Sequence, residues 1–150
     1  MDAETVVRRL ARTSIWKSDF WVAFVLAGQS EADTVLSKLC GALAEEPGWV
    51  TVTRPEVPDE FSTSLLHKAN VSPPVSTLAD ILWVDVRRCA PRAVPELLFH
   101  ANDFHHLLRC GMVFSGPPAV KSVFRTASPH LFGVRSGMFE VPKRRTRAAR

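Results

Sequence analysis

The sequence contains no long hydrophobic segment, no paired cysteines and no basic-then-apolar stretch at its beginning. Its longest apolar run, residues 20–28, reaches about half of the ~20 residues that a membrane-spanning helix requires. The three cysteines are widely spaced and contain no CxxC pair, which is typical of reduced thiols rather than of a disulfide framework or a zinc site. Cys40 and Cys110 fall in or just after apolar helix patterns, so we expect them to be inert core residues. These absences predict a cytoplasmic protein without a membrane span.

Positive charge is concentrated at the C-terminal end. The 150 residues include 19 Lys plus Arg against 15 Asp plus Glu, but five of the cations fall in residues 143–150. The rest of the chain is near neutral, so the basic balance does not indicate a nucleic-acid-binding face on the folded part. We expect a single α/β domain over 1–142, which includes an N-terminal helix over 2–13, and a basic, disordered tail over 143–150.

Hydrophobic periodicity predicts a regular succession of strands and helices. Continuous apolar or period-two patterns predict strands over 20–27, 49–53, 81–86, 112–114 and, last, 131–134. Helical periodicity predicts helices over 2–13, 30–46, 59–69, 91–109 and 119–127, with 14–19 as a connector. Strands that alternate with helices form a parallel sheet with helices on both faces. The expected fold is therefore three-layer α/β, with a mostly parallel sheet of about five strands.

Three segments of the chain have the layout of a nucleotide-binding fold. Residues 21–40 are arranged as strand, loop and helix like a phosphate-binding unit, and Ile81-Leu-Trp-Val-Asp85 is an apolar run ended by an acid, like a Walker B strand. Gly111-Met-Val-Phe-Ser-Gly116 is similar to the strand whose polar residue senses the γ-phosphate. Over residues 20–135 the chain thus resembles a P-loop NTPase of the AAA+/STAND type. For the STAND group, the resemblance implies a protein partner in a signalling or defence assembly.

The loop itself departs from a working P-loop. In GxxxxGK[ST], glycines let backbone N–H groups surround the phosphates, Lys reaches the β and γ oxygens, and Ser or Thr holds Mg²⁺. Here Gly28-Gln-Ser-Glu-Ala-Asp-Thr34 keeps the first Gly and the Thr, is one residue shorter, and has Asp33 near the place of the Lys. Glu31 and Asp33 also place negative charge where a phosphate needs the positive end of the helix dipole. A simple strand-to-helix turn explains Gly28 without any phosphate.

The acid of the Walker B-like strand is also incomplete as a catalytic unit. Asp85 is followed by Val86 and Arg87 rather than by a second acid, so hydrolysis would lack its usual base. Without a ligand, Asp85 is expected to cap a neighbouring helix or to pair with Arg87.

These departures predict a non-catalytic, degenerate NTPase-like domain that works as a regulatory or protein-interaction module, without a cofactor. Arg outnumbers Lys by 14 to 5, which is typical of a high-GC genome and suggests a bacterial source. One alternative is an ATPase or GTPase with an atypical P-loop, which would bind ATP or GTP with Mg²⁺. Its nucleotide contacts would be Gly28, Ser30, Thr34, Asp85 and, as a sensor, Ser115. A second alternative is a nucleic-acid-binding accessory that acts through the tail over 143–150.

One predicted helix carries most of the other candidate chemistry. His100, His105 and His106 point in three directions at about 100° per residue, so we expect no metal site there. Phe99 and Leu107 lie away from the main apolar stripe of the same helix. These two residues are expected to face the other side of the sheet layer or a partner.

Overall fold

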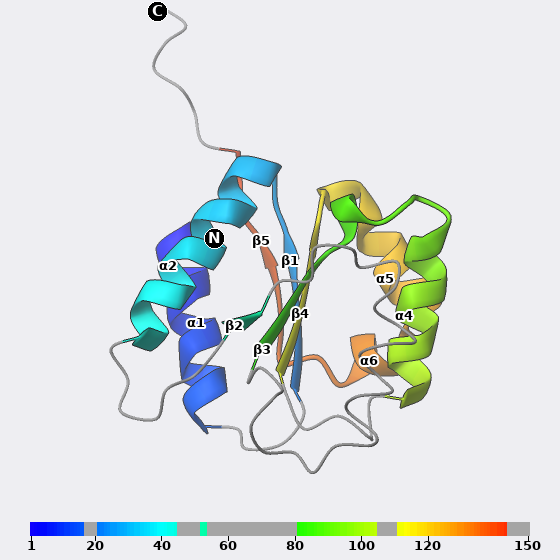
Figure 1. Cartoon of the computed structure of the whole chain (residues 1–150), viewed down its shortest axis with the longest axis horizontal. Helices are drawn as coiled ribbons and strands as arrows, with labels where there is room; N and C mark the ends of the chain where they lie inside the picture. Colours follow the sequence, from blue (N-terminus) through cyan, green and yellow to red (C-terminus); the bar gives the residue numbers. More distant parts are fainter. Residues whose placement is uncertain (17–20, 45–51, 54–80, 105–110, 144–150) are drawn as a thin grey trace, which may run out of the picture.

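Parallel strands form the middle layer of the molecule, with helices on both sides (Figure 1). The computed structural model describes residues 1–16, 21–44, 52–53, 81–104 and 111–143. Its elements are, in chain order, α1 (Ala3–Trp16), β1 (Trp21–Leu26), α2 (Gln29–Ala44), β2 (Val52–Thr53), β3 (Ile81–Asp85), the 3₁₀ helix η2 (Val86–Arg88), α4 (Ala93–Phe104), β4 (Gly111–Gly116), the 3₁₀ helix η4 (Pro118–Val120), α5 (Lys121–Ala127), α6 (Pro129–Gly133) and β5 (Gly137–Glu140). The expected three-layer α/β fold is confirmed in this described part.

Some expectations lie outside the described residues. They are the first part of the strand over 49–53, the helix over 59–69, the end of the helix over 91–109 with His105, His106 and Leu107, Cys110, and the tail beyond residue 143.

The five described strands follow the order β2-β3-β4-β1-β5, and every pair is parallel. All residues of β1, β3 and β4 are buried. Strands buried on both faces need apolar side chains at successive positions, which explains their continuous apolar runs. In register, Asp85 of β3 lies beside Ser115 of β4, and Ser115 lies beside Val25 of β1. The carboxyl ends of the three central strands therefore meet at one edge of the sheet.

Alternate side chains of the strands enter two separate cores. On one face, Phe24 and Phe114 pack with Phe124 of α5, with ring centroids of Phe24 and Phe124 4.9 Å apart. On the other face, Trp83 and its neighbours pack with apolar residues of α1 and α2, among them Leu39. Figure 1 shows the same division, with α1 and α2 on one side of the sheet and α4, α5 and α6 on the other. The apolar stripes of the helices are thus all buried against the sheet.

The first helix is longer than its sequence pattern indicates. The expected connector over 14–19 is wrong for residues 14–16, because α1 continues to Trp16. Thr13 Oγ1 donates to the carbonyl of Arg9 at 2.9 Å, so this hydroxyl is satisfied inside the helix instead of ending it.

The last strand is present but displaced from its predicted position. Residues 131–134 were expected as a strand, whereas Pro129–Gly133 form α6 and the strand is β5, which pairs with β1. Pro129 suits the first turn of a helix because its missing N–H is not needed there. The side chain of Asn102, from α4, also accepts the backbone N–H groups of His130 and Leu131 at 2.8 and 3.1 Å. A cap from another helix cannot be seen in a local pattern.

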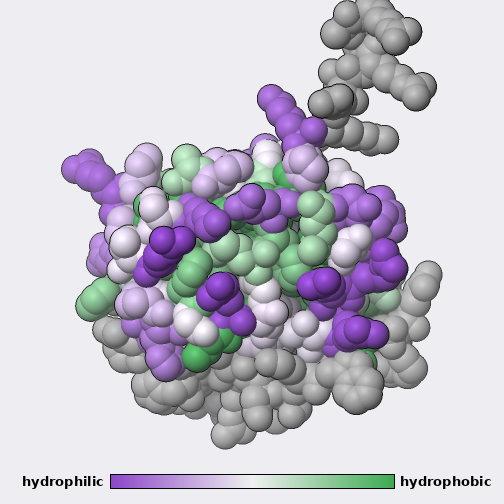
Figure 2. All heavy atoms as spheres, turned by 180° about the vertical axis from the view of Figure 1, so that it is seen from behind, coloured by the Kyte–Doolittle hydropathy of each residue, from purple (hydrophilic) through white to green (hydrophobic). Residues whose placement is uncertain are grey.

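The strand β5 forms one edge of the sheet and faces the side seen in Figure 2. On this side apolar side chains gather near the centre, with hydrophilic side chains around them. No helix in the described part of the chain is long and apolar enough to cross a membrane.

The expectation that Cys40 is a core residue is wrong, because this cysteine lies on the outward face of α2 and is exposed.

Candidate functional site

The connection between β1 and α2 lies at the carboxyl edge of the sheet and contains only two residues. β1 ends at Leu26 and α2 begins at Gln29. Ala27 still donates its N–H to the carbonyl of Gly116 at 2.9 Å, and the Gly28 carbonyl already accepts the first helical hydrogen bond from Ala32 at 2.9 Å. A phosphate-binding loop needs several backbone N–H groups between strand and helix. This connection has no such loop.

The start of α2 is covered by an acid of the same helix. The Oε2 atom of Glu31 lies 2.5 Å from the position that a Cβ atom on Gly28 would take. Gly28 is the N-cap residue and Glu31 the third helical residue, which is the spacing of a capping box. An anionic ligand at a helix N-terminus uses the same first-turn N–H groups and the same positive dipole end. The carboxylate of Glu31 thus lies against the residue that precedes the first turn of α2.

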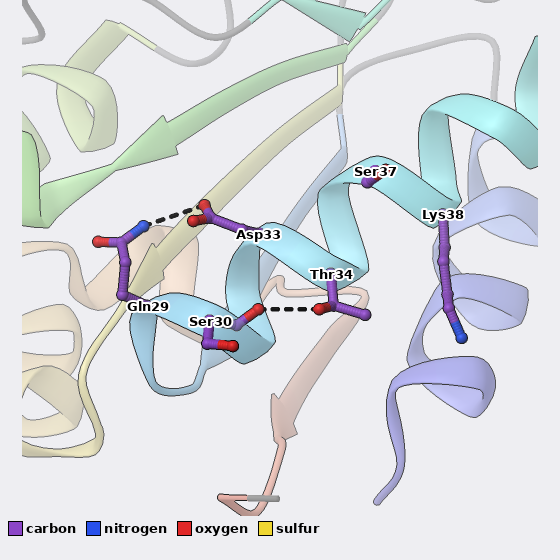
Figure 3. Close-up of a pocket in the computed structure, with 6 residues that line it drawn as sticks. All are labelled: Gln29, Ser30, Asp33, Thr34, Ser37 and Lys38. Atoms are coloured by element: carbon purple, nitrogen blue, oxygen red, sulfur yellow. Dashed lines mark hydrogen bonds between the residues drawn. The ribbon is translucent and has the colours of Figure 1, made fainter.

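Gln29 connects α2 with the end of β3. Its Nε2 atom donates to Oδ1 of Asp33 at 3.0 Å and to Oδ2 of Asp85 at 3.3 Å. Figure 3 shows the side chain of Gln29 directed toward Asp33 across one turn of the helix. An amide donor therefore lies between two carboxylates at the carboxyl edge of the sheet.

Asp85 is buried, with 2% of its surface exposed, and its second oxygen is also occupied. Oδ1 accepts the backbone N–H of Arg87 at 3.0 Å and caps η2, and the Arg87 guanidinium lies 4.0 Å away. The same guanidinium donates to the carbonyl of Ala27 at the end of β1. The interpretation of Asp85 as a cap and ion-pair partner of Arg87 is confirmed. Arg87 also ties the ends of β3 and β1 together.

Ser115 lies beside Asp85 in the sheet and is fully buried. Both residues follow at period two from side chains in the core under α1 and α2, so they lie on the sheet face that α2 covers. Among the described residues, the Ser115 hydroxyl has no hydrogen-bond partner.

The five residues predicted as nucleotide contacts divide into two groups. Gly28, Asp85 and Ser115 lie at the carboxyl edge of the sheet. Ser30 and Thr34 lie on the exposed side of α2, where the Thr34 hydroxyl donates to the Ser30 carbonyl at 2.9 Å (Figure 3). They line a shallow surface hollow with Ser37 and Lys38. The structure brings only the first group together.

Gln29 was missed by the sequence interpretation of this site. Its spacing of four residues from Asp33 was a usable signal, because such pairs face each other on a helix. Its contact with Asp85, 56 residues away, had no sequence signal.

Solved structures with a similar fold come from replication proteins. They include the Aeropyrum pernix ORC2 protein in its ADP form, with TM-score 0.53, 13% identity and coverage of 93% of this chain and 47% of that one. A Drosophila ORC structure bound to AT-rich DNA and Cdc6 matches with TM-score 0.57, 12% identity and coverage of 95% and 29%. A DNA replication initiation factor matches with TM-score 0.53, 16% identity and coverage of 93% and 44%.

These likenesses show the fold, which is that of AAA+ P-loop ATPase domains. The chain spans less than half the length of the proteins that it matches. No protein-family model matches the sequence, and no curated protein matches it. The resemblance to a P-loop NTPase is thus confirmed for the fold, at the level of architecture.

Proposed function

We propose that this chain is a non-catalytic, degenerate NTPase-like domain that works as a regulatory or protein-interaction module. The observation that carries the proposal is the start of α2, which follows β1 after two residues and has the Glu31 carboxylate against Gly28. The backbone groups that would hold phosphates are thus few, and the chain's own side chain lies over them.

The charges around the site support the same conclusion. Three carboxylates, those of Glu31, Asp33 and Asp85, lie in this corner, and the side chain next to Asp85 on α2 is the neutral amide of Gln29. Two unit charges about 4 Å apart repel by ~4 kcal/mol at an effective dielectric of about 20. Arg87 is the cation nearest to Asp85 in the described residues, and it is already bonded to Ala27. A nucleotide phosphate would meet net repulsion.

The assembly in which such a module acts is part of the proposal. The resemblance of residues 20–135 to the STAND group supports a bacterial signalling or defence complex. The domain would then present its surface to a protein partner.

The decisive test is calorimetric titration of the protein with ATP, GTP and their diphosphates, with and without Mg²⁺. We expect no heat of binding up to about 1 mM nucleotide, which corresponds to a free energy weaker than about −4 kcal/mol. Stoichiometric binding with a micromolar Kd would overturn the proposal.

A pair of variants separates a lost site from a blocked one. Glu31→Gln removes the charge over Gly28, and Glu96→Gln removes an exposed acid of α4 as a matched control. If the short β1–α2 connection is the reason that nucleotide does not bind, neither variant shows a heat of binding in the same titration. Binding by Glu31→Gln alone would mean that the carboxylate blocks an otherwise competent site.

A second candidate function is an atypical ATPase or GTPase. A cavity of about 480 Å³ lies beside Gly28, between the carboxyl ends of β1 and β5, and Lys143 is among its lining residues. This cavity has room and a cation for part of a nucleotide. The candidate predicts Mg²⁺-dependent nucleotide binding that Asp85→Ala abolishes, and binding that is unchanged in this variant would remove it.

A third candidate function is nucleic-acid binding through residues 143–150. Five cations in these residues and the DNA-bound state of a structure with the same fold favour it. Binding of this kind weakens steeply with salt because counterions are released. Deletion of 143–150 should then lower the affinity for duplex DNA at about 50 mM salt, whereas equal affinity after the deletion would exclude this function.

A further inference from the structure

A small apolar pocket lies at the carboxyl edge of the sheet, on the face opposite α2. Its volume is about 250 Å³, and it lies between η2, α4, η4 and α5. The side chains of Val86, Cys89, Val94, Val120 and Val123 are among its lining residues. Because Val86, Cys89 and Val94 also belong to the core on this face, the pocket is a depression in the core itself. Its size suits one or two apolar side chains rather than a whole cofactor, for which pockets of about 300–1,000 Å³ are usual.

The pocket is held open by rigid backbone. Pro91 and Pro95 line it from the start of α4, and Pro117 lines it from the residue before η4. Proline fixes φ, so these walls lose little conformational freedom when a ligand binds. Phe99, one turn after Pro95 on α4, is an exposed apolar side chain on the same helix, with 56% of its surface accessible. This position agrees with the expectation that Phe99 lies away from the main apolar stripe.

Arginines belong to the segments that line this apolar floor. Arg87 lines the pocket, but its guanidinium lies 4.0 Å from Asp85 and donates to the Ala27 carbonyl, so its charge is already paired. Arg88 and Arg92 are exposed and adjoin lining residues in the chain, and neither forms an ion pair with a described residue. Glu96 is the acid that follows on α4. The segments that line the pocket thus carry two exposed arginines against one exposed acid, which is an excess of positive charge.

We propose that this pocket binds a short segment of a partner protein in which apolar side chains are flanked by carboxylates. The apolar side chains would fill the floor, and the carboxylates would pair with Arg88 and Arg92. An apolar floor offers no hydrogen bonds to a sugar-phosphate backbone, which favours a peptide over a nucleic acid. This inference rests on the protein-interaction part of the proposed function, and it identifies the surface and the chemistry of the partner.

The test uses the full chain and a fluorescein-labelled hexapeptide, Asp-Glu-Leu-Phe-Glu-Asp, in a fluorescence anisotropy titration. Two control peptides replace the four acids by Lys, or Leu-Phe by Ser-Ser. We expect saturable binding of the first peptide and at least about tenfold weaker binding of either control, a difference of ~1.4 kcal/mol. No binding of the first peptide to the folded protein at about 1 mM, or equal binding of all three, would overturn the inference.

Variants locate the binding surface. The double variant Arg88→Glu/Arg92→Glu changes two exposed side chains and should weaken binding of the acidic peptide about tenfold, since each lost surface pair contributes up to ~1 kcal/mol. Arg8→Glu, on the exposed side of α1 across the sheet, is the matched control and should bind unchanged. Thermal unfolding of all variants confirms that they are folded. Equal weakening in Arg8→Glu would place the peptide elsewhere.

The same titration, repeated with ATP and Mg²⁺ present, separates the two proposals. Nucleotide binding together with peptide binding at this pocket would refute the loss of the nucleotide site and leave the present inference intact. Absence of both would refute the pocket as a peptide site and leave the degenerate nucleotide site intact.

Discussion

The carboxyl edge of the sheet differs between its two faces. On the α2 face, where the fold leads one to expect a phosphate, Gln29 lies between Asp33 and Asp85, and Glu31 lies on Gly28. On the α4 face an apolar pocket stays open, and the exposed Arg88 and Arg92 in the segments that line it form no ion pair with a described residue. On the first face most polar side chains are bonded within the chain, with the buried Ser115 hydroxyl as an exception among the described residues, whereas the second face keeps exposed charge. The difference supports the proposal that binding takes place on the second face.

The largest expected effect is on the core below the open face. Phe124→Ala removes a fully buried ring that packs against Phe24 and Phe114, and such changes cost about 3–5 kcal/mol. Urea unfolding followed by circular dichroism measures the change. Val123→Ala, on the same helix but only half-buried, is the matched control and should cost less than ~1.5 kcal/mol. Equal losses in the free energy of unfolding would mean that the ring cluster stabilises this face no more than the pocket wall does.

The next largest effect concerns Arg87, which belongs to both faces. Arg87→Ala removes the donor to Ala27 and the cation 4.0 Å from buried Asp85, so we expect a loss of about 2 kcal/mol in the free energy of unfolding. Arg88→Ala, an exposed neighbour, should change stability by less than ~0.5 kcal/mol. If the two variants unfold at the same urea concentration, Arg87 does not connect β3 with β1 in solution.

A smaller effect is expected at the closed face. Gln29→Ala removes the amide between two carboxylates and should cost ~1 kcal/mol. Gln29→Glu should cost more, because a third carboxylate then faces Asp33 and Asp85. The measurement compares the free energies of unfolding of these two variants in urea. A Glu variant as stable as the native protein would show that a cation enters this corner.

The smallest effect is kinetic and compares two thiols. Cys40 is exposed on α2, whereas Cys89 is buried at the pocket. Partial burial raises the pKa of the Cys40 thiol, so at neutral pH it is almost entirely protonated and reacts slowly with iodoacetamide. Labelling of Cys40 should accelerate as the pH rises toward this raised pKa and should stay faster than that of Cys89. Mass spectrometry of the labelled peptides measures both, and faster labelling of Cys89 would mean that the pocket opens.

Local sequence patterns were sufficient for the central sheet and for the departure of the β1–α2 connection from a P-loop. The apolar runs that form β1 and β3 are continuous because both faces of a central parallel strand are buried. Successive residues of these strands are therefore apolar, which a local pattern detects. The missing Lys and the acids after Gly28 are likewise local features. They predicted that the helix would satisfy its own N-terminus, which agrees with the position of Glu31.

Contacts between distant segments decided the remaining features. Asn102 of α4 caps α6, so residues 129–133 are helical and the edge strand begins only at Gly137. Gln29 and Arg87 acquire their roles from partners 56 and 60 residues away. The pocket likewise exists only because η2, α4 and η4 meet at one edge of the sheet. Burial and helical periodicity depend on neighbouring residues, so the sequence alone determines them. The partners of a side chain across the sheet depend on which strand and helix ends the tertiary packing brings together.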